Sequence, residues 1–92
     1  MELKELEKIS KALGDINRLK ILMDMAASDG SIQCARIMTL MDLAQPSVSH
    51  HIKTLTEAGL IEVEKDGRNY TYVLNRDLLK DFSKELEALA TK

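Results

Sequence analysis

The stretch QPSVSHHIKTLTEAGLI, residues 45–61, contains the pattern that decides the fold. Three apolar residues recur in it at steps of four and three, Val48, Ile52 and Leu55. This spacing is typical of one buried face of an α-helix. Pro46 is compatible with the first helical turn, where backbone amides have no partner within the helix, and Gly59 suits the C-terminal end. We therefore predict a helix from about Gln45 to Ala58.

A second, shorter helix is predicted directly before this one, over residues 32–41. About three residues, 42–44, connect the two. Two helices joined by so short a turn are typical of a helix-turn-helix unit, which here covers about residues 32–58. The outward face of its second helix is then the face that can read another molecule.

Two more helices are indicated nearer the N-terminus. Apolar residues recur at near-helical spacing over residues 2–13. After Gly14, the side-chain oxygen of Asp15 can cap a helix that ends near Ser28. Its apolar positions are numerous enough to make it the central core helix: Ile16, Leu19, Ile21, Leu22, Met23 and Met25. Residues 28–31, SDGS, are predicted to form a loop.

After Gly59 the pattern changes to the alternation of β-strands. LIEVE at 60–64 and YTYVL at 70–74 flank Asp66-Gly67, a tight-turn signal, so a β-hairpin with a charged tip is predicted. A last helix is predicted over about 77–90. The fold class is therefore mainly α with a β-hairpin wing: four helices, two strands and a helix, a single winged helix-turn-helix domain over residues 1–92.

The charge balance gives little general support for nucleic-acid binding. The 92 residues carry 13 Lys and Arg against 15 Asp and Glu, a net charge of −2. Residues 31–76 hold five bases and five acids, so any DNA contact needs a small local basic face. The lone cysteine, Cys34, excludes an intrachain disulfide and indicates a reducing cytoplasm. Because no apolar run approaches about 20 residues, no membrane span is expected.

Three stretches resemble the ArsR/SmtB (arsenic-repressor) family of winged helix-turn-helix transcription regulators. LGDINRLKIL (13–22) resembles the family's entry to its second helix. QPSVSHHIKTLTEAGLI (45–61) resembles its recognition helix, and KDGRNYTYVLN (65–75) resembles its wing. The resemblance implies a cytoplasmic homodimeric repressor, not an enzyme, that binds double-stranded DNA at a near-palindromic operator.

The resemblance also implies which residues meet DNA. The N-terminal part of a recognition helix reads base edges in the major groove, and Gln and Ser can both do so. The resemblance implies that four residues contact bases: Gln45, Ser47, Ser49 and His50. Phosphate contact is expected from Lys53 and Thr54 on the same side, and Lys65 and Arg68 are expected to reach DNA from the wing.

Dimerisation is assigned to the first and last helices, each of which would leave apolar surface exposed on its own. The residues involved are Leu3, Leu6, Leu79, Phe82, Leu86 and Leu89. Two recognition helices would then lie about one helical turn of DNA apart, ~34 Å. The alternative is a protein-interaction or oligomerisation module without specific DNA binding. The net acidity and Ala44, where the family has a capping Ser or Thr, favour this alternative slightly.

Neither metal site of the family is expected. Its motif E-L-C-V-C-D-L would place cysteines at Gln33 and Ala35, but the thiol is at Cys34, and the last helix has no histidine. No cofactor is therefore predicted, and the effector is unknown. Cys34 is a candidate redox or effector residue, with a small buried apolar residue as the alternative.

The paired histidines and the methionines have simpler interpretations. His50 and His51 diverge by roughly 100° on a helix, which disfavours a shared metal ion. His51 is expected to be a satisfied interior residue. Serine–histidine catalysis is disfavoured because there is no glycine-rich nucleophile turn. Arg18 is expected to be a capping or ion-pairing residue, and the methionines are expected to fill the core.

Overall fold

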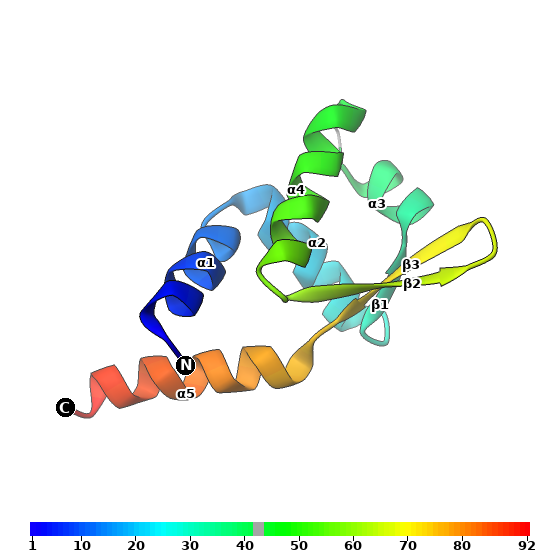
Figure 1. Ribbon diagram of the computed structural model, residues 1–92. Coiled ribbons are helices and arrows are strands. Elements are labelled where there is room, and N and C mark those ends of the chain that lie inside the picture. The colour runs from blue at the N-terminus through cyan, green and yellow to red at the C-terminus, as the bar shows by residue number, and fades with distance from the viewer. Residues whose placement is uncertain (42–43) are drawn as a thin grey trace.

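The computed structural model describes residues 1–41 and 44–92, and all their side chains except those of residues 45, 66 and 69. Residues 42–43 of the predicted turn, 42–44, therefore lie outside the described part. Figure 1 shows the arrangement of the elements. They are α1 (Leu3–Leu13), α2 (Ile16–Ala27), β1 (Ser31–Gln33), α3 (Cys34–Leu40), α4 (Gln45–Glu57), β2 (Ile61–Asp66), β3 (Asn69–Leu74) and α5 (Arg76–Ala90). The predicted fold class is confirmed, with one added strand.

The added strand, β1, corrects the sequence interpretation of residues 31–33. These residues were expected to end a loop and start a helix, but they pair antiparallel with β3 in a sheet of order β1-β3-β2. Ile32 is buried opposite Tyr72, and α3 begins only at Cys34. Three residues are too few to show an alternating pattern, so the pairing partner, not the local sequence, decides this strand.

The hairpin forms where the alternation predicts it, but its turn lies one residue later. Asp66 pairs with Asn69, so the two loop residues are Gly67 and Arg68. Gly67 has φ +62°, the left-handed conformation that residues with a Cβ adopt reluctantly. This places Arg68 at the extreme tip of the wing.

The core lies between α2, α4 and the sheet. Its largest fully buried side chains are Ile9, Ile21, Met25, Ile37, Leu55, Leu60 and Ile61. In α2 the prediction is only half right, because Ile21, Leu22 and Met25 are buried whereas Ile16, Leu19 and Met23 are exposed. The methionines divide in the same way: Met25 and Met41 fill the core, and Met23 and Met38 do not.

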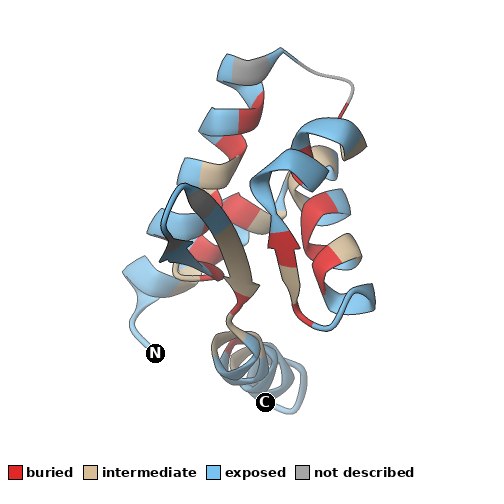
Figure 2. Cartoon of the chain, turned by 90° about the vertical axis from the view of Figure 1, so that its right-hand side faces the viewer, coloured by how far each residue is buried: buried red, intermediate tan, exposed pale blue. Residues whose placement is uncertain are grey.

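Helix α5 projects from the body of the molecule. It lies along one end in Figure 1, and in Figure 2 it is seen nearly end-on, mostly in the exposed colour. The long dimension is 46 Å against 24 and 22 Å for the other two. Phe82 and its neighbours Leu78 and Leu79 anchor this helix to the core, whereas its C-terminal part has apolar residues without cover.

Candidate nucleic-acid interface

Helix α4 divides cleanly into a buried face and an exposed face. Val48 is 3% exposed and Leu55 is fully buried, which fixes the helix against the body. Ser47, Ser49, His50 and Lys53 are all exposed. The predicted base-reading residues thus share the outward surface. Gln45 is the exception, since its side chain lies outside the described part of the chain.

The two residues expected to meet phosphate differ in what they can offer. Lys53 is exposed, and it is the one Lys or Arg in α4. Thr54 is half-buried, and its hydroxyl donates to the carbonyl oxygen of His50 (2.9 Å). A phosphate accepts hydrogen bonds, so a hydroxyl that already donates within its own helix is a weak ligand for it. Lys53 is the better supported of the two.

The wing has a basic face and an acidic face. Residues paired across antiparallel strands point to the same side of a sheet. Lys65 pairs with Tyr70, and the Lys65 ammonium lies 5.6 Å from the centre of the Tyr70 ring, a cation–π contact. Glu62 and Glu64 belong to the alternate pairs and therefore face the other way.

The basic face of the wing is the one that adjoins the helix-turn-helix unit. Tyr72, which shares the face of Tyr70, lines a hollow of about 230 Å³ together with Ser49 and Lys53 of α4. Glu62 instead lines a hollow at the start of α5. Glu62 and Glu64 are thus directed away from α4. The local basic face that DNA binding requires is present despite the net charge of −2.

Cys34 lies in a groove between α3 and the wing. It is exposed, so the alternative of a buried apolar residue is wrong. It lines one hollow with Arg68 and Tyr70, and another with Met38 and Tyr72. Burial chiefly, with a contribution from the nearby thiol, raises the pKa of the Tyr72 hydroxyl. Within the described residues, no three His, Cys, Asp or Glu side chains are grouped to hold a metal ion.

The two histidines have different environments, as their positions on the helix predict. His50 is exposed, and His51 is 9% exposed with its Nδ1 3.1 Å from the guanidinium of Arg18. The prediction that His51 is a satisfied interior residue is confirmed. Their ring centres are 6.1 Å apart and the planes are tilted by 52°.

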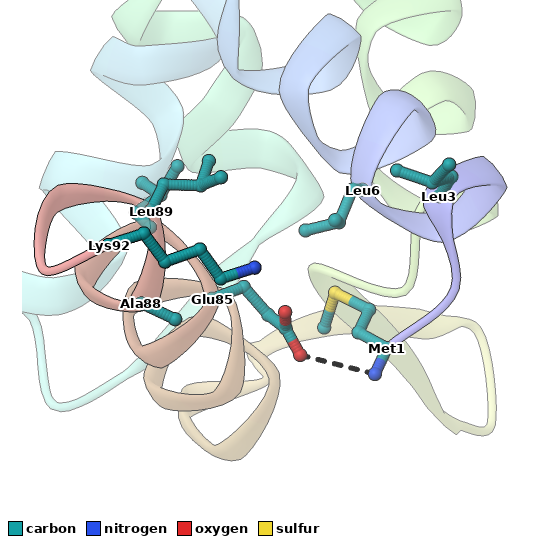
Figure 3. Close-up of a pocket in the computed structure, with 8 residues that line it drawn as sticks. Met1, Leu3, Leu6, Glu85, Ala88, Leu89 and Lys92 are labelled. Carbon is teal, nitrogen blue, oxygen red and sulfur yellow. Dashed lines mark hydrogen bonds and ion pairs between the residues drawn. The ribbon is translucent and has the colours of Figure 1, made fainter.

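The faces assigned to dimerisation meet at a hollow between α1 and α5. Leu3 and Leu6 of α1 and Leu89 of α5 surround it, with a volume of about 300 Å³ (Figure 3). The amino group of Met1 donates to Glu85 (3.2 Å) at its edge. Of the six predicted residues, Leu3, Leu86 and Leu89 are exposed and Leu6 and Leu79 are half-buried, whereas Phe82 is only 8% exposed. Phe82 therefore belongs to the core of its own chain and leaves little surface for a partner.

Comparison with known proteins identifies the family. A helix-turn-helix domain family matches residues 13–64, which span α2 to β2. The arsenical resistance operon repressor of Staphylococcus aureus is 36% identical over 91 residues, which cover 99% of this chain and 86% of that protein. The chain belongs to the ArsR/SmtB family. The members of this family are transcription regulators with a DNA-binding winged helix, not enzymes.

Solved structures of ArsR proteins have the same fold. An ArsR-like regulator from Rhodococcus aligns with a TM-score of 0.82 at 24% identity, over 96% of this chain and 81% of that one. The solution structure of a homodimeric winged helix-turn-helix domain from Mycobacterium bovis aligns with a TM-score of 0.75 at 24% identity, over 97% of this chain and 81% of that one. At this identity the likeness concerns the fold alone. No helix within the described residues is long and apolar enough to cross a membrane.

Proposed function

We propose that this ArsR-family chain is a homodimeric repressor that binds a near-palindromic operator in double-stranded DNA. In this proposal the whole of residues 1–92 acts as one winged-helix domain. Helix α4 enters the major groove, and Ser47, Ser49 and His50 contact base edges from its outward face. Lys53 contributes affinity through phosphate, as do Lys65 and Arg68 on the wing. A dimer bound over a promoter blocks transcription.

The division of α4 into two faces is the observation that carries the proposal. Hydroxyl and imidazole groups that serve base edges are exposed together, while Val48 and Leu55 hold the helix rigidly from behind. A surface that binds another protein would instead favour exposed aromatic or arginine anchors in this place. The basic face of the wing adjoins the same surface, which suits a polyanion.

Dimerisation through α1 and α5 is supported by the apolar surface around the hollow that these helices share. Leu3, Leu86 and Leu89 are large, exposed and close to one another, which costs free energy in an isolated chain. A second copy related by a twofold axis would cover this surface with the same residues. The homodimeric Mycobacterium bovis domain with the same fold agrees with this proposal.

Cys34 is the residue at which we propose that an effector acts. It is the only thiol and it is exposed next to Arg68 at the tip of the wing. Oxidation or arsenical binding there would alter the approach of the wing to DNA. Its test is DNA affinity measured with reduced and with oxidised or arsenite-treated protein. Cys34→Ser is the matched control that should respond to neither treatment.

A protein-interaction module is the second candidate, and one observation favours it. Ile16, Leu19 and Met23 recur at steps of three and four along α2 and are all exposed. They form an apolar stripe that the DNA-binding proposal does not use. A wild-type protein that bound every duplex equally weakly would favour this second candidate.

The proposal is tested with an operator obtained by selecting a random-sequence duplex library on the wild-type protein. Fluorescence anisotropy then gives the dissociation constants for this operator and for a scrambled duplex. We expect His50→Ala to lower the ratio between the two, roughly tenfold, because a base contact discriminates by about 1–3 kcal/mol. Arg68→Ala should weaken binding to both duplexes alike and reduce the salt dependence.

Lys80→Ala is the matched control for Arg68→Ala, since Lys80 is an exposed base on α5, outside the helix-turn-helix unit and the wing. This variant should leave both dissociation constants within about twofold of the wild-type values. Equal losses on the operator and the scrambled duplex for His50→Ala and Ser49→Ala would refute a base-reading role for α4.

A further inference from the structure

Arg18 joins three elements at one point. Its Nε donates to the carbonyl oxygen of Ala12 (2.7 Å), and one terminal nitrogen donates to that of Lys11 (2.9 Å). Both carbonyls belong to the last turn of α1, and that of Lys11 also accepts from the backbone amide of Gly14 (3.2 Å). The other terminal nitrogen lies 3.1 Å from Nδ1 of His51 in α4. One side chain of α2 thus links the end of α1 to the middle of the recognition helix.

The link to α4 has a defined chemistry. A guanidinium group only donates hydrogen bonds, so Nδ1 of His51 must be the acceptor and carry no proton. The ring proton is then on Nε2. His51 is 9% exposed, so little water competes for this bond. Because its donor is charged, the bond is stronger than a neutral one.

The base of the link is itself held in place. The Asp15 carboxylate caps α2 by accepting from the backbone amides of Asn17 (2.8 Å) and Arg18 (3.2 Å). The same oxygen lies 3.9 Å from Nδ1 of His51. The start of α2, the end of α1 and the buried side of α4 therefore meet in one polar cluster. Such a cluster specifies one relative arrangement of the three helices, whereas apolar packing tolerates small rotations.

We propose that Arg18 is a positioning residue that sets the angle of the recognition helix relative to the dimerisation helix α1. The inference rests on the proposed function, in which α1 helps to form the dimer and α4 reads DNA. In a symmetric dimer, a change in the angle between α1 and α4 alters the separation of the two recognition helices. The Arg18–His51 bond thus selects the half-site spacing without touching DNA.

The test measures spacing preference, which loss of stability alone does not change. The operator selected on wild-type protein is rebuilt with the centre lengthened or shortened by one and by two base pairs. Each base pair added or removed moves a half-site by about 3.4 Å and rotates it by about 35°. The readout is the ratio of affinities for the original and altered duplexes, measured on one preparation. An inactive fraction lowers both affinities equally and cancels in this ratio.

Two variants cut different parts of the link. Arg18→Met removes it completely, whereas His51→Leu removes only the bond to α4 and leaves the carbonyls of Ala12 and Lys11 capped. We expect the wild-type preference for its own spacing, roughly tenfold or more per base pair, to fall to about two- to threefold in both variants. If Arg18→Met does not fold, the result with His51→Leu decides.

Arg36→Met is the matched control. Arg36 also connects two helices, since it donates from α3 to Asp24 of α2 (3.3 Å), but it contacts neither α1 nor α4 in the hydrogen bonds of the described residues. Its spacing preference should equal that of the wild type. An unchanged preference in His51→Leu, or an equal reduction in Arg36→Met, would overturn the role of Arg18. A wild-type protein without any spacing preference would instead refute the proposed function itself.

Discussion

Helices α4 and α5 each have a stripe of apolar residues along one face, but the two stripes are buried to very different extents. In α4, Val48 and Leu55 are 3% and 0% exposed, and the chain itself supplies the cover. In α5, Phe82 is buried, but Leu86 and Leu89 further along are 49% and 65% exposed. Periodicity therefore locates the apolar face of a helix without indicating what covers it. The body of one chain suffices for α4, whereas the end of α5 projects beyond it (Figure 1).

The strongest test of this contrast is the loss of a core side chain from α4. We expect Leu55→Ala to lower the free energy of unfolding by about 2–5 kcal/mol, because a fully buried leucine leaves a cavity as well as losing its transfer free energy. Urea unfolding followed by circular dichroism measures this. A loss below about 1 kcal/mol would contradict the view that α4 is fixed by its own chain.

A smaller effect of a different kind is expected at the end of α5. Leu89→Ala should raise the dimer dissociation constant about 5–30-fold, which corresponds to about 1–2 kcal/mol of apolar burial between two chains. Sedimentation velocity over a range of protein concentrations measures it. Met23→Ala on α2 is the control, since Met23 is as exposed as Leu89 but lies outside the proposed interface. Equal changes in both variants would exclude α5 as a specific interface.

The same contrast separates what the sequence predicted from what it did not. The ends of α4, the cap at Asp15 and the hairpin depend on residues close together in the chain, and the structure agrees with these predictions apart from a shift of the hairpin turn by one residue. Among the proposed DNA-binding residues, the outward group on α4 follows from the same local periodicity. The donation of the Thr54 hydroxyl to His50 could not be read from spacing, because it depends on the rotamer of one side chain.

The missed features depend on contacts between distant residues. Strand β1 exists because β3, some 40 residues later, offers a partner edge. The number of apolar residues in α2 predicts Ile16 and Leu19 in the core, but both lie on the exposed face of the helix, opposite Ile21 and Met25. The capping role of Arg18 was expected, yet its acceptors were not, since these lie six, seven and 33 residues away.

The N-terminal ends of the two helices provide a third test. The cap of α5 is Asn75, whose side chain accepts from the amide of Leu78 (3.2 Å), whereas α4 begins after Ala44, which has no side-chain acceptor. Ala44 has φ −64° and ψ 147°, an extended conformation that suits a capping serine. We expect Ala44→Ser to raise the free energy of unfolding by about 1 kcal/mol, measured by urea unfolding. Ala90→Ser, at the last residue of α5, should give no such gain.

The smallest expected effect concerns acid and the polar cluster behind α4. Hydrogen bonds from the backbone amide of Arg18, and then of Asn17, lower the pKa of Asp15 below its ordinary value of 3.8 against the opposing effect of burial, with a smaller contribution from the charge of Arg18. A carboxyl whose pKa is lower in the folded chain stabilises that chain at any pH above its ordinary value. This contribution is lost as the pH falls through the folded pKa, because the neutral carboxyl accepts the two amides less strongly than the carboxylate does.

Asp15→Asn should therefore flatten the dependence of stability on pH below about 4, while its amide oxygen still caps α2. Unfolding free energies measured from pH 7 down to pH 2.5 give the slope of stability against pH for the wild type and for Asp15→Asn. Asp81→Asn removes an exposed carboxyl from α5 and keeps Asp15, so this variant should lose as much stability in acid as the wild type does. Identical slopes in wild type and Asp15→Asn would mean that the cluster holds α4 by packing alone. In that case α4 and α5 would differ only in how far their apolar residues are buried, because the charged groups behind α4 would contribute no stability that is lost in acid.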